Sequence, residues 1–254
     1  MQVEREKPVL VTGSAGRMGR AASAALLRAG WTVRGLDLVQ TPLTQVESIQ
    51  GSLTDLTLLN EAMAGVGAVI HLAATPDDED FPSQLLPNNI LGVYNMMESA
   101  RVAGVKRLVL ASTGQVNWWQ QAEGPWPIRG EDPITPRHWY AAGKVFLEAA
   151  GRAYARNERA SVIAVRLGWC PRTRAQVAEI YKSPLGQNVY FSPEDVGRFF
   201  TRSIEAPMPA GYHLIFAASR PLTKAVLDLE AGKALLGWEP LDQWPRGAEQ
   251  DLPG

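Results

Sequence analysis

The chain has 254 residues, 46% hydrophobic and 20% charged, which is the composition of a globular protein rather than of a disordered or fibrous one. With 25 basic against 26 acidic side chains, its net charge of −1 creates no overall field that would attract nucleic acid or an anionic membrane. One cysteine and three histidines predict no disulfide framework and no metal site. Without a signal-peptide core or an apolar run of roughly 20 residues, we expect a cytoplasmic protein.

Short apolar runs alternate with amphipathic segments along the first two thirds of the chain. Six strands are expected, over residues 8–12, 32–38, 46–51, 68–72, 106–112 and 161–167. Helices are expected over 17–28, 55–64 (capped by Thr54), 83–103 and 138–157, with a loop over 113–136. Because parallel strands need long crossovers, this alternation predicts an α/β fold with a doubly wound parallel sheet, the Rossmann fold.

The pattern changes after Gly168. A polar stretch leads to a helix opened by residues 192–195, a short strand over 212–217 and a last helix over about 223–236. We expect residues 168–254 to form a small substrate-binding region at the carboxyl ends of the strands, where ligands of such sheets bind.

A glycine-rich loop follows the first strand and opens the first helix. Its spacing is G-x-x-G-x-x-G, with Gly13, Gly16 and Gly19 as the glycines. Such glycines permit a tight turn and the approach of backbone to a pyrophosphate, and the helix N-terminus supplies free N–H groups. The loop predicts a dinucleotide site, with contacts also from Ala15, Arg17 and Met18, although a glycine turn here can also be purely structural.

Asp37 ends the second strand. A carboxylate there can accept hydrogen bonds from the adenosine ribose and would repel a 2′-phosphate, which favours NAD over NADP. Arg17 and Arg34 are nearby cations that weaken this preference. Residues 1–167 are therefore predicted to form an NAD-binding domain.

Tyr140 and Lys144 lie four residues apart, on one face of an expected helix. A lysine ammonium beside a tyrosine favours the phenolate, and it can also hydrogen-bond a nicotinamide ribose. Ser112 and Thr113 end the fifth strand, where a hydroxyl could orient a substrate oxygen. A Y-x-x-x-K pair alone is common on helices, so the prediction depends on the order of all these motifs.

Together these features resemble the extended short-chain dehydrogenase/reductase family, the NAD-dependent epimerase/dehydratase group. The matching segments are TGSAGRMG at 12–19, HLAA at 71–74, NILGVYN at 89–95, ASTGQV at 111–116, YAAGK at 140–144 and VRLG at 165–168. The resemblance implies that Thr113 is the catalytic hydroxyl, with Ser112 as the alternative, and that Tyr140 is the base. It further implies cofactor contacts from Leu72, Ala73, Ala74, Asn89, Ser52 and Leu53, although many members carry Asp where this chain has Ser52. His71 is expected to be a packed strand residue.

Within the family, the chain is similar to uronate dehydrogenases, which oxidise the anomeric carbon of a hexuronic acid with NAD. The resemblance implies substrate contacts from Thr75, Gly114, Gln115, Trp169, Arg172 and Arg174, one of the two arginines binding a carboxylate. Gly114–Gln115 and Trp169 depart from the residues of those enzymes. Trp118, Trp119 and Trp126 could form a sugar-stacking wall, lid packing or an oligomer contact.

The sequence therefore predicts an NAD-dependent oxidoreductase acting on a small hydroxylated substrate, a sugar or uronic acid. The alternatives are a sugar epimerase with tightly held NAD and a dinucleotide-sensing protein without turnover. A sensor needs no phenolate, so the tyrosine–lysine pair argues against it. The resemblance also implies a homodimer that pairs through helices 83–103 and 138–157.

Overall fold

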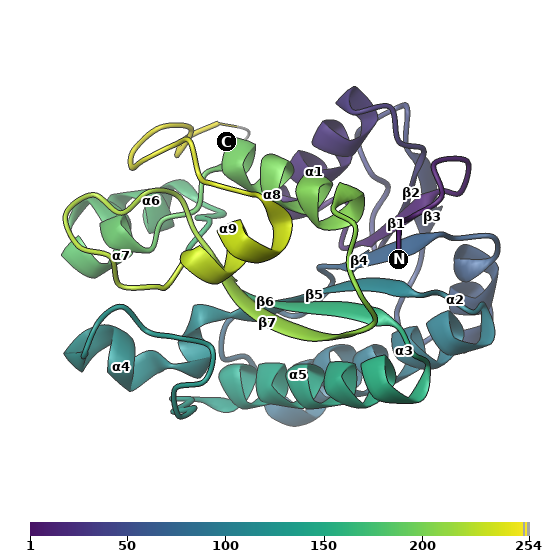
Figure 1. Cartoon of the computed structure of the whole chain (residues 1–254), viewed down its shortest axis with the longest axis horizontal. Helices are drawn as coiled ribbons and strands as arrows, with labels where there is room; N and C mark the ends of the chain where they lie inside the picture. Colours follow the sequence, from purple (N-terminus) through teal and green to yellow (C-terminus); the bar gives the residue numbers. More distant parts are fainter. Residues whose placement is uncertain (251, 253–254) are drawn as a thin grey trace.

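A computed structural model describes residues 1–250 and 252, and a seven-stranded parallel sheet is its centre. The strands lie in the order β3-β2-β1-β4-β5-β6-β7 (Figure 1). They are β1 (Val9–Thr12), β2 (Val33–Asp37), β3 (Glu47–Gln50), β4 (Ala68–His71), β5 (Arg107–Thr113), β6 (Ser161–Leu167) and β7 (Gly211–Ala217). After β1 the strands are added on one side of the sheet as β2 and β3, and from β4 onward they are added on the other side of β1. This reversal of strand order between β1 and β4 creates a crevice at the carboxyl ends of these two strands.

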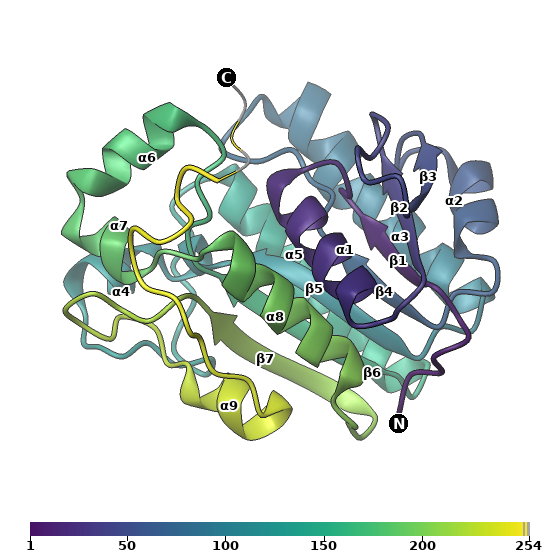
Figure 2. The same cartoon turned by 90° about the horizontal axis from the view of Figure 1, so that it is seen from above.

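Helices cover both faces of the sheet. On one face α1 (Arg17–Arg28) and α8 (Pro193–Glu205) run side by side (Figure 2), and on the other lie α2 (Leu56–Met63), α3 (Gly92–Val102) and α5 (Trp139–Asn157). Alternate strand residues serve the two faces: Val9 and Val11 pack into the cluster under α1 and α8, and Leu10 into the cluster above α3 and α5. This double burial explains the uninterrupted apolar runs of the strands.

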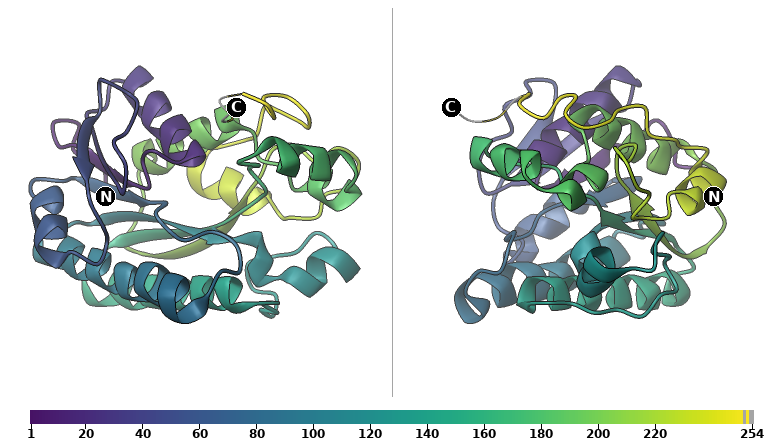
Figure 3. Two further views of the ribbon diagram at one scale, coloured as in Figure 1. Left: turned by 180° about the vertical axis from the view of Figure 1, so that it is seen from behind. Right: turned by 90° about the vertical axis from the view of Figure 1, so that its left-hand side faces the viewer.

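Several short elements lie beyond the carboxyl ends of the strands. They are η2 (Gly114–Val116, a 3₁₀ turn), α4 (Trp118–Glu123), α6 (Arg174–Tyr181) and α7 (Pro184–Asn188), while α9 (Glu230–Leu236) packs beside β7. The right-hand view of Figure 3 looks onto this end, with α6 and α7 above α4. No helix of the described residues is both long and apolar enough to cross a membrane.

The six strands expected from the sequence are confirmed to within one residue at either end. Two helix predictions need correction. Asp55, not Thr54, caps α2, because its carboxylate accepts the N–H of Leu58 at 3.0 Å. The helix expected over 83–103 divides into a π-helical segment η1 (Phe81–Leu91) and α3, since Pro87 within η1 has no N–H to donate.

The chain beyond Gly168 differs most from expectation. It contributes β7, which pairs with β6 along its whole length, and α8, which covers α1, so it completes the main sheet. The helices α6 and α7, and α4 in the earlier loop, were not predicted. The last helix starts at Glu230 rather than near 223, because the backbone N–H groups of Thr223 and Lys224 donate to the Asn188 side chain instead. The division at residue 168 stays a prediction.

Candidate active site

A cavity of about 860 Å³ lies at the carboxyl ends of the central strands. It brings together most of the residues predicted from the sequence: Gly13, Gly16, Arg17, Met18, Gly19, Asp37, Ser52, Leu53, Leu72, Ala73, Ala74, Thr75, Ser112, Thr113, Gly114, Gln115, Tyr140, Lys144, Trp169 and Arg172. Three predicted residues, Ala15, Asn89 and Arg174, do not line it. The cavity lies at the switch point of the sheet, where this fold binds its ligands.

The glycine loop forms a close-packed cradle at one end of the cavity. Gly13 has φ +72°, and a Cβ there would lie 2.7 Å from the backbone nitrogen of Ala73. A Cβ on Gly19 would lie 2.0 Å from the carbonyl oxygen of Gly13. No side chain caps the N-terminus of α1 and its first turn holds no acid, so the helix offers N–H groups to an anion. These features fit the pyrophosphate of a dinucleotide.

Asp37 lies beside this cradle, where its Oδ2 accepts the backbone N–H of Ala15 at 2.9 Å. Ala15 therefore contributes through the position of Asp37. The two cations that weakened the preference for NAD are both occupied: Arg34 pairs with Glu47 at 2.9 Å and donates to carbonyls at the end of α2.

Arg17 is buried, not solvated, and binds the C-terminal segment. Its guanidinium donates to the carbonyl oxygens of Pro171, Gly247, Ala248 and Gln250. It thus fastens the glycine loop to residues more than 150 positions away in the sequence, and it has few donors left for a 2′-phosphate.

The segment after β4 forms the floor beside the glycine loop. Asn89 braces it: the Asn89 side chain accepts the N–H of Thr75 at 2.8 Å and donates to the Thr75 carbonyl at 2.9 Å. His71 is buried in β4 with its Nδ1 2.8 Å from Thr12 Oγ1, and burial lowers its pKa to about 3. His71 is thus a packed strand residue and does not line the cavity.

The tyrosine–lysine pair projects from the start of α5, whose N-terminus is capped by His138. Lys144 is buried, its Nζ donates to the Ala111 carbonyl at 2.8 Å, and burial lowers its pKa to about 8. The ammonium lies 5.6 Å from the centre of the Tyr140 ring.

Burial raises the pKa of Tyr140 to about 12; the Arg172 guanidinium opposes this rise and the Asp77 carboxylate adds to it. The lowering of the Tyr140 pKa assigned to Lys144 from the sequence stays a prediction.

The structure separates the roles of the two hydroxyls at the end of β5. Ser112 donates to Glu148 at 2.6 Å, and Glu148 forms a buried bidentate ion pair with Arg166. Thr113 lines the cavity, and its hydroxyl oxygen accepts the N–H of Gln115 at 3.2 Å, which leaves its proton free for a ligand. Thr113 is therefore the candidate for catalysis, and Ser112 joins β5 to α5.

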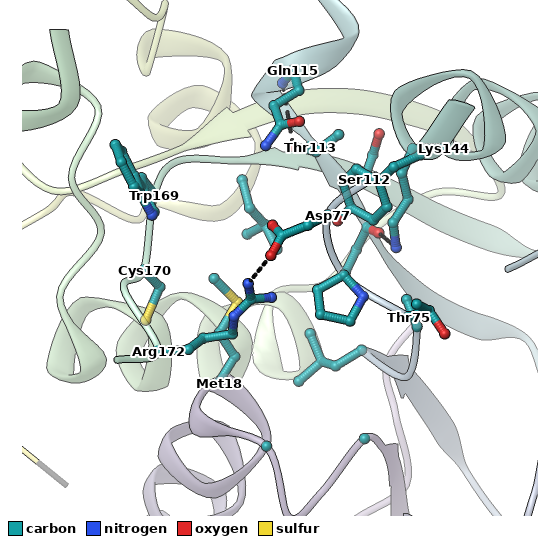
Figure 4. Close-up of a pocket in the computed structure, with 18 of the residues that line it drawn as sticks. Met18, Thr75, Asp77, Ser112, Thr113, Gln115, Lys144, Trp169, Cys170 and Arg172 are labelled. Carbon is teal, nitrogen blue, oxygen red and sulfur yellow. Dashed lines mark hydrogen bonds and ion pairs between the residues drawn. The ribbon is translucent and has the colours of Figure 1, made fainter. Parts of the chain in front are cut away.

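Gln115, from the segment after β5, lies beside Thr113, and the segment after β6, with Trp169, Cys170 and Arg172, lies across the cavity from Lys144 (Figure 4). Arg172 Nη2 lies 2.5 Å from Asp77 Oδ2. Arg174 is two-thirds exposed outside the cavity and faces Glu249 at 3.9 Å, so of the two predicted arginines the structure brings only Arg172 into the cavity. Of the three loop tryptophans only Trp118 lines the cavity; Trp126 packs beneath Lys224, whose Nζ lies 3.9 Å from the ring centre.

The cavity also contains residues that the sequence did not single out, namely Asp77, Asp78, Asn88, Gln121, His138, Gln176, Glu179 and Ser183. Asp77 and Asp78 could have been found, because they follow β4 at the same edge of the sheet as Thr113. Gln176 and Glu179 come from α6, a helix that the sequence did not predict.

Comparison with known proteins agrees with this arrangement. The pattern of the NAD dependent epimerase/dehydratase family matches residues 9–169. The chain is 31% identical to L-arabinose 1-dehydrogenase (NAD(P)(+)) of Haloferax volcanii, over 79% of this chain and 84% of that protein. It is 29% identical to uronate dehydrogenase of Agrobacterium fabrum, over 93% of this chain and 85% of that one. A uronate dehydrogenase variant of Agrobacterium tumefaciens in complex with NAD superposes with a TM-score of 0.76 at 28% identity, covering 93% of this chain and 85% of that one.

Proposed function

Because the chain belongs to the NAD-dependent epimerase/dehydratase family, we propose that this NAD-dependent oxidoreductase removes a hydride from a hydroxyl-bearing carbon of a small sugar or sugar acid. One observation carries the proposal: Thr113, Tyr140 and Lys144 line the same cavity as the glycine cradle and Asp37. A site with the cradle alone could only bind a dinucleotide, whereas a hydroxyl, a phenol and an ammonium beside it can perform acid–base chemistry.

The proposal assigns a role to each of the three side chains. A bound NAD would supply the hydride acceptor. Thr113 donates a hydrogen bond from its hydroxyl group to the substrate oxygen and so orients the hydroxyl group that is oxidised. Tyr140 takes the proton of that hydroxyl group at its phenolic oxygen. Lys144 holds the nicotinamide ribose, and its positive charge favours the phenolate.

We call the part of the cavity beside Thr113 and Tyr140 the substrate side, and its lining is suited to a sugar. It holds several amide and hydroxyl groups that can pair with the hydroxyls of a polyol, namely Thr75, Asn88, Gln115, Gln121, Gln176 and Ser183. The Oε1 atom of Gln115 is buried without a hydrogen-bond partner, which suits a substrate donor. We propose that residues 1–167 hold NAD and supply part of the sugar site, and that residues 168–254, with Trp169 and Arg172, complete that site.

The experiment that tests this function is a panel of neutral sugars and sugar acids supplied with NAD, following the absorbance of the reduced cofactor. We expect one or more of these substrates to produce reduced cofactor in amounts that exceed the enzyme. Simple alcohols serve as the control. The proposal fails if no sugar of the panel reduces NAD, whether or not the alcohols react.

Replacing Asp37 by alanine should weaken the binding of NAD and reduce the preference for NAD over NADP. Loss of hydrogen bonds to a charged group costs about 1.5–3 kcal/mol, which corresponds to roughly tenfold to hundredfold in Kd. Titration of each cofactor against the protein measures this. Glu61→Ala is the matched control, because Glu61 is exposed on α2 and lies outside the cavity. Parent protein that binds NADP as tightly as NAD would show that Asp37 lacks this role.

We propose that the chain forms a homodimer through α3 and α5. Tyr94 and Val102 on α3, Leu91 at the end of η1 and Phe146 on α5 are exposed large apolar side chains on neighbouring helices. A two-fold axis would bury them against the same helices of a second copy. Light scattering should give a dimer for the parent and a monomer for Tyr94→Glu/Phe146→Glu, whereas Leu241→Glu, at an exposed site elsewhere, should stay dimeric. A monomeric parent would contradict the proposal.

A further inference from the structure

An ion pair joins two walls of the substrate side. Asp77 belongs to the segment after β4 and Arg172 to the segment after β6, and their nearest atoms lie 2.5 Å apart. Figure 4 shows the pair between these two segments, near Thr75, Cys170 and Thr113. Asp77 is 60% exposed and Arg172 37% exposed, so solvent screens the attraction between the two charges.

Both partners are placed by contacts of their own segments. Asp77 has φ +62°, a left-handed conformation that aspartate and asparagine tolerate better than most residues. Two residues earlier, Thr75 is held by Asn88 and Asn89. On the other wall the backbone N–H of Arg172 donates to Gln176 at 2.6 Å. The backbone near each partner is therefore held by contacts of its own segment, and the two charges meet across the cavity.

The charges around this pair are predominantly negative. Four parts of the chain line this side of the cavity: the segments after β4, β5 and β6, and the helix α6. Their described lining residues include three carboxylates, Asp77, Asp78 and Glu179. Arg172 is the one guanidinium in that set. The other two cations that line the cavity already have partners. Lys144 donates to the carbonyl of Ala111, and Arg17 donates to carbonyls of the C-terminal segment.

A sugar acid and a neutral sugar meet this arrangement differently. To reach Arg172, a substrate carboxylate must separate it from Asp77 and then lie beside that uncompensated carboxylate, which like-charge repulsion disfavours. A neutral sugar leaves the ion pair intact, and its hydroxyl groups can donate to carboxylate oxygens on this wall.

We propose that Asp77 is a specificity-determining residue, which by pairing with Arg172 across the cavity makes the site favour neutral sugars over the corresponding sugar acids. This rests on the proposed sugar dehydrogenase function and names the substrate class within it. Arg172 can then bind a substrate carboxylate only after its ion pair with Asp77 has broken.

The test compares substrates that differ only in the acid group: D-glucose with D-glucuronate, and D-galactose with D-galacturonate. The quantity measured is the ratio of kcat/KM for the acid to kcat/KM for the neutral sugar, with NAD. The parent should favour the neutral member of each pair. Asp77→Asn keeps the size and the backbone preference of the residue and should raise the ratio about two- to fivefold, a modest change because the pair is exposed to solvent. Adding Arg172→Ala to that variant should remove the gain.

Asp78→Asn is the matched control, since it removes the same charge from the neighbouring residue but leaves Arg172 paired. Its ratio should change much less than that of Asp77→Asn. A parent that favours the acids, an unchanged ratio in Asp77→Asn, or an equal rise in Asp78→Asn would each overturn the proposal.

Failure of the proposed function gives a different result, in which no sugar of either kind reduces NAD. In that case calorimetry of D-glucose and D-glucuronate binding to the NAD-loaded protein measures the corresponding ratio of affinities. A gain in glucuronate affinity in Asp77→Asn supports the role of Asp77 even then, and an unaltered preference contradicts it.

Discussion

Replacing Tyr140 by phenylalanine should abolish turnover and leave NAD binding nearly unchanged. The substitution removes one hydroxyl and keeps the ring, so a lost rate reflects chemistry and not packing. Positioned acid–base groups contribute about 10²–10⁴-fold to a rate, and we expect a loss in that range. Steady-state rates with the best sugar of the panel and a titration of NAD together measure the two effects.

The control for this variant lies on the same helix. Tyr154 also belongs to α5, but its hydroxyl donates to the carbonyl of Val105 far from the cavity. Tyr154→Phe should keep the parent rate while losing about 1 kcal/mol of stability for one hydrogen bond. A fully active Tyr140→Phe protein would remove Tyr140 from the mechanism.

Below a pH of about 8, where Lys144 keeps its charge, the parent rate should also increase with pH, because the phenolate form of Tyr140 is the base and burial raises its pKa to about 12. This rise should vanish from any residual activity of Tyr140→Phe.

Replacing Lys144 by methionine should impair both chemistry and cofactor binding. Methionine matches the length of the side chain without its charge, so the phenolate loses a neighbouring cation and the ribose loses a donor. We expect kcat to fall by about 10²-fold and the Kd for NAD to rise by roughly tenfold or more. The two quantities come from the same assays as for Tyr140.

Lys106→Met is the matched control for Lys144. Lys106 is exposed, lies outside the cavity and donates to the carbonyl of Glu158. It should leave both quantities unchanged. If Lys144→Met binds NAD as the parent does, the proposed contact between Lys144 and the ribose is wrong, whatever the effect on kcat.

The residues that sequence reasoning placed well share one property: each stands at the carboxyl end of a parallel strand or at the start of the following helix. Gly13 follows β1, Asp37 ends β2, Thr113 ends β5 and Tyr140 opens α5. In a parallel sheet all these points meet at one edge, so local periodicity alone predicts that the residues lie together.

Other assignments depend on contacts between distant parts of the chain. The family resemblance ranks Thr113 before Ser112, and the hydrogen bond of Ser112 to Glu148, which pairs with Arg166, supplies the physical reason that Ser112 is occupied. Arg172 and Arg174 lie on one short segment, but α6 begins at Arg174 and turns that side chain out of the cavity.

The helices that escaped prediction are short and have little periodicity of their own. The helix α7 spans Pro184–Asn188, and α6 buries only Val177 and Ile180. Their stability comes from packing near β7 and the C-terminal segment, which no local pattern records.

The most direct measurement is the transfer of a label from a sugar to the cofactor. A sugar that carries deuterium on the carbon of its reacting hydroxyl is incubated with the protein and NAD, and both products are analysed by mass spectrometry. We predict one deuterium in each molecule of reduced cofactor and an equal amount of oxidised sugar. A sugar product at the oxidation level of the substrate, with no net reduced cofactor, would contradict hydride transfer as the outcome of the reaction.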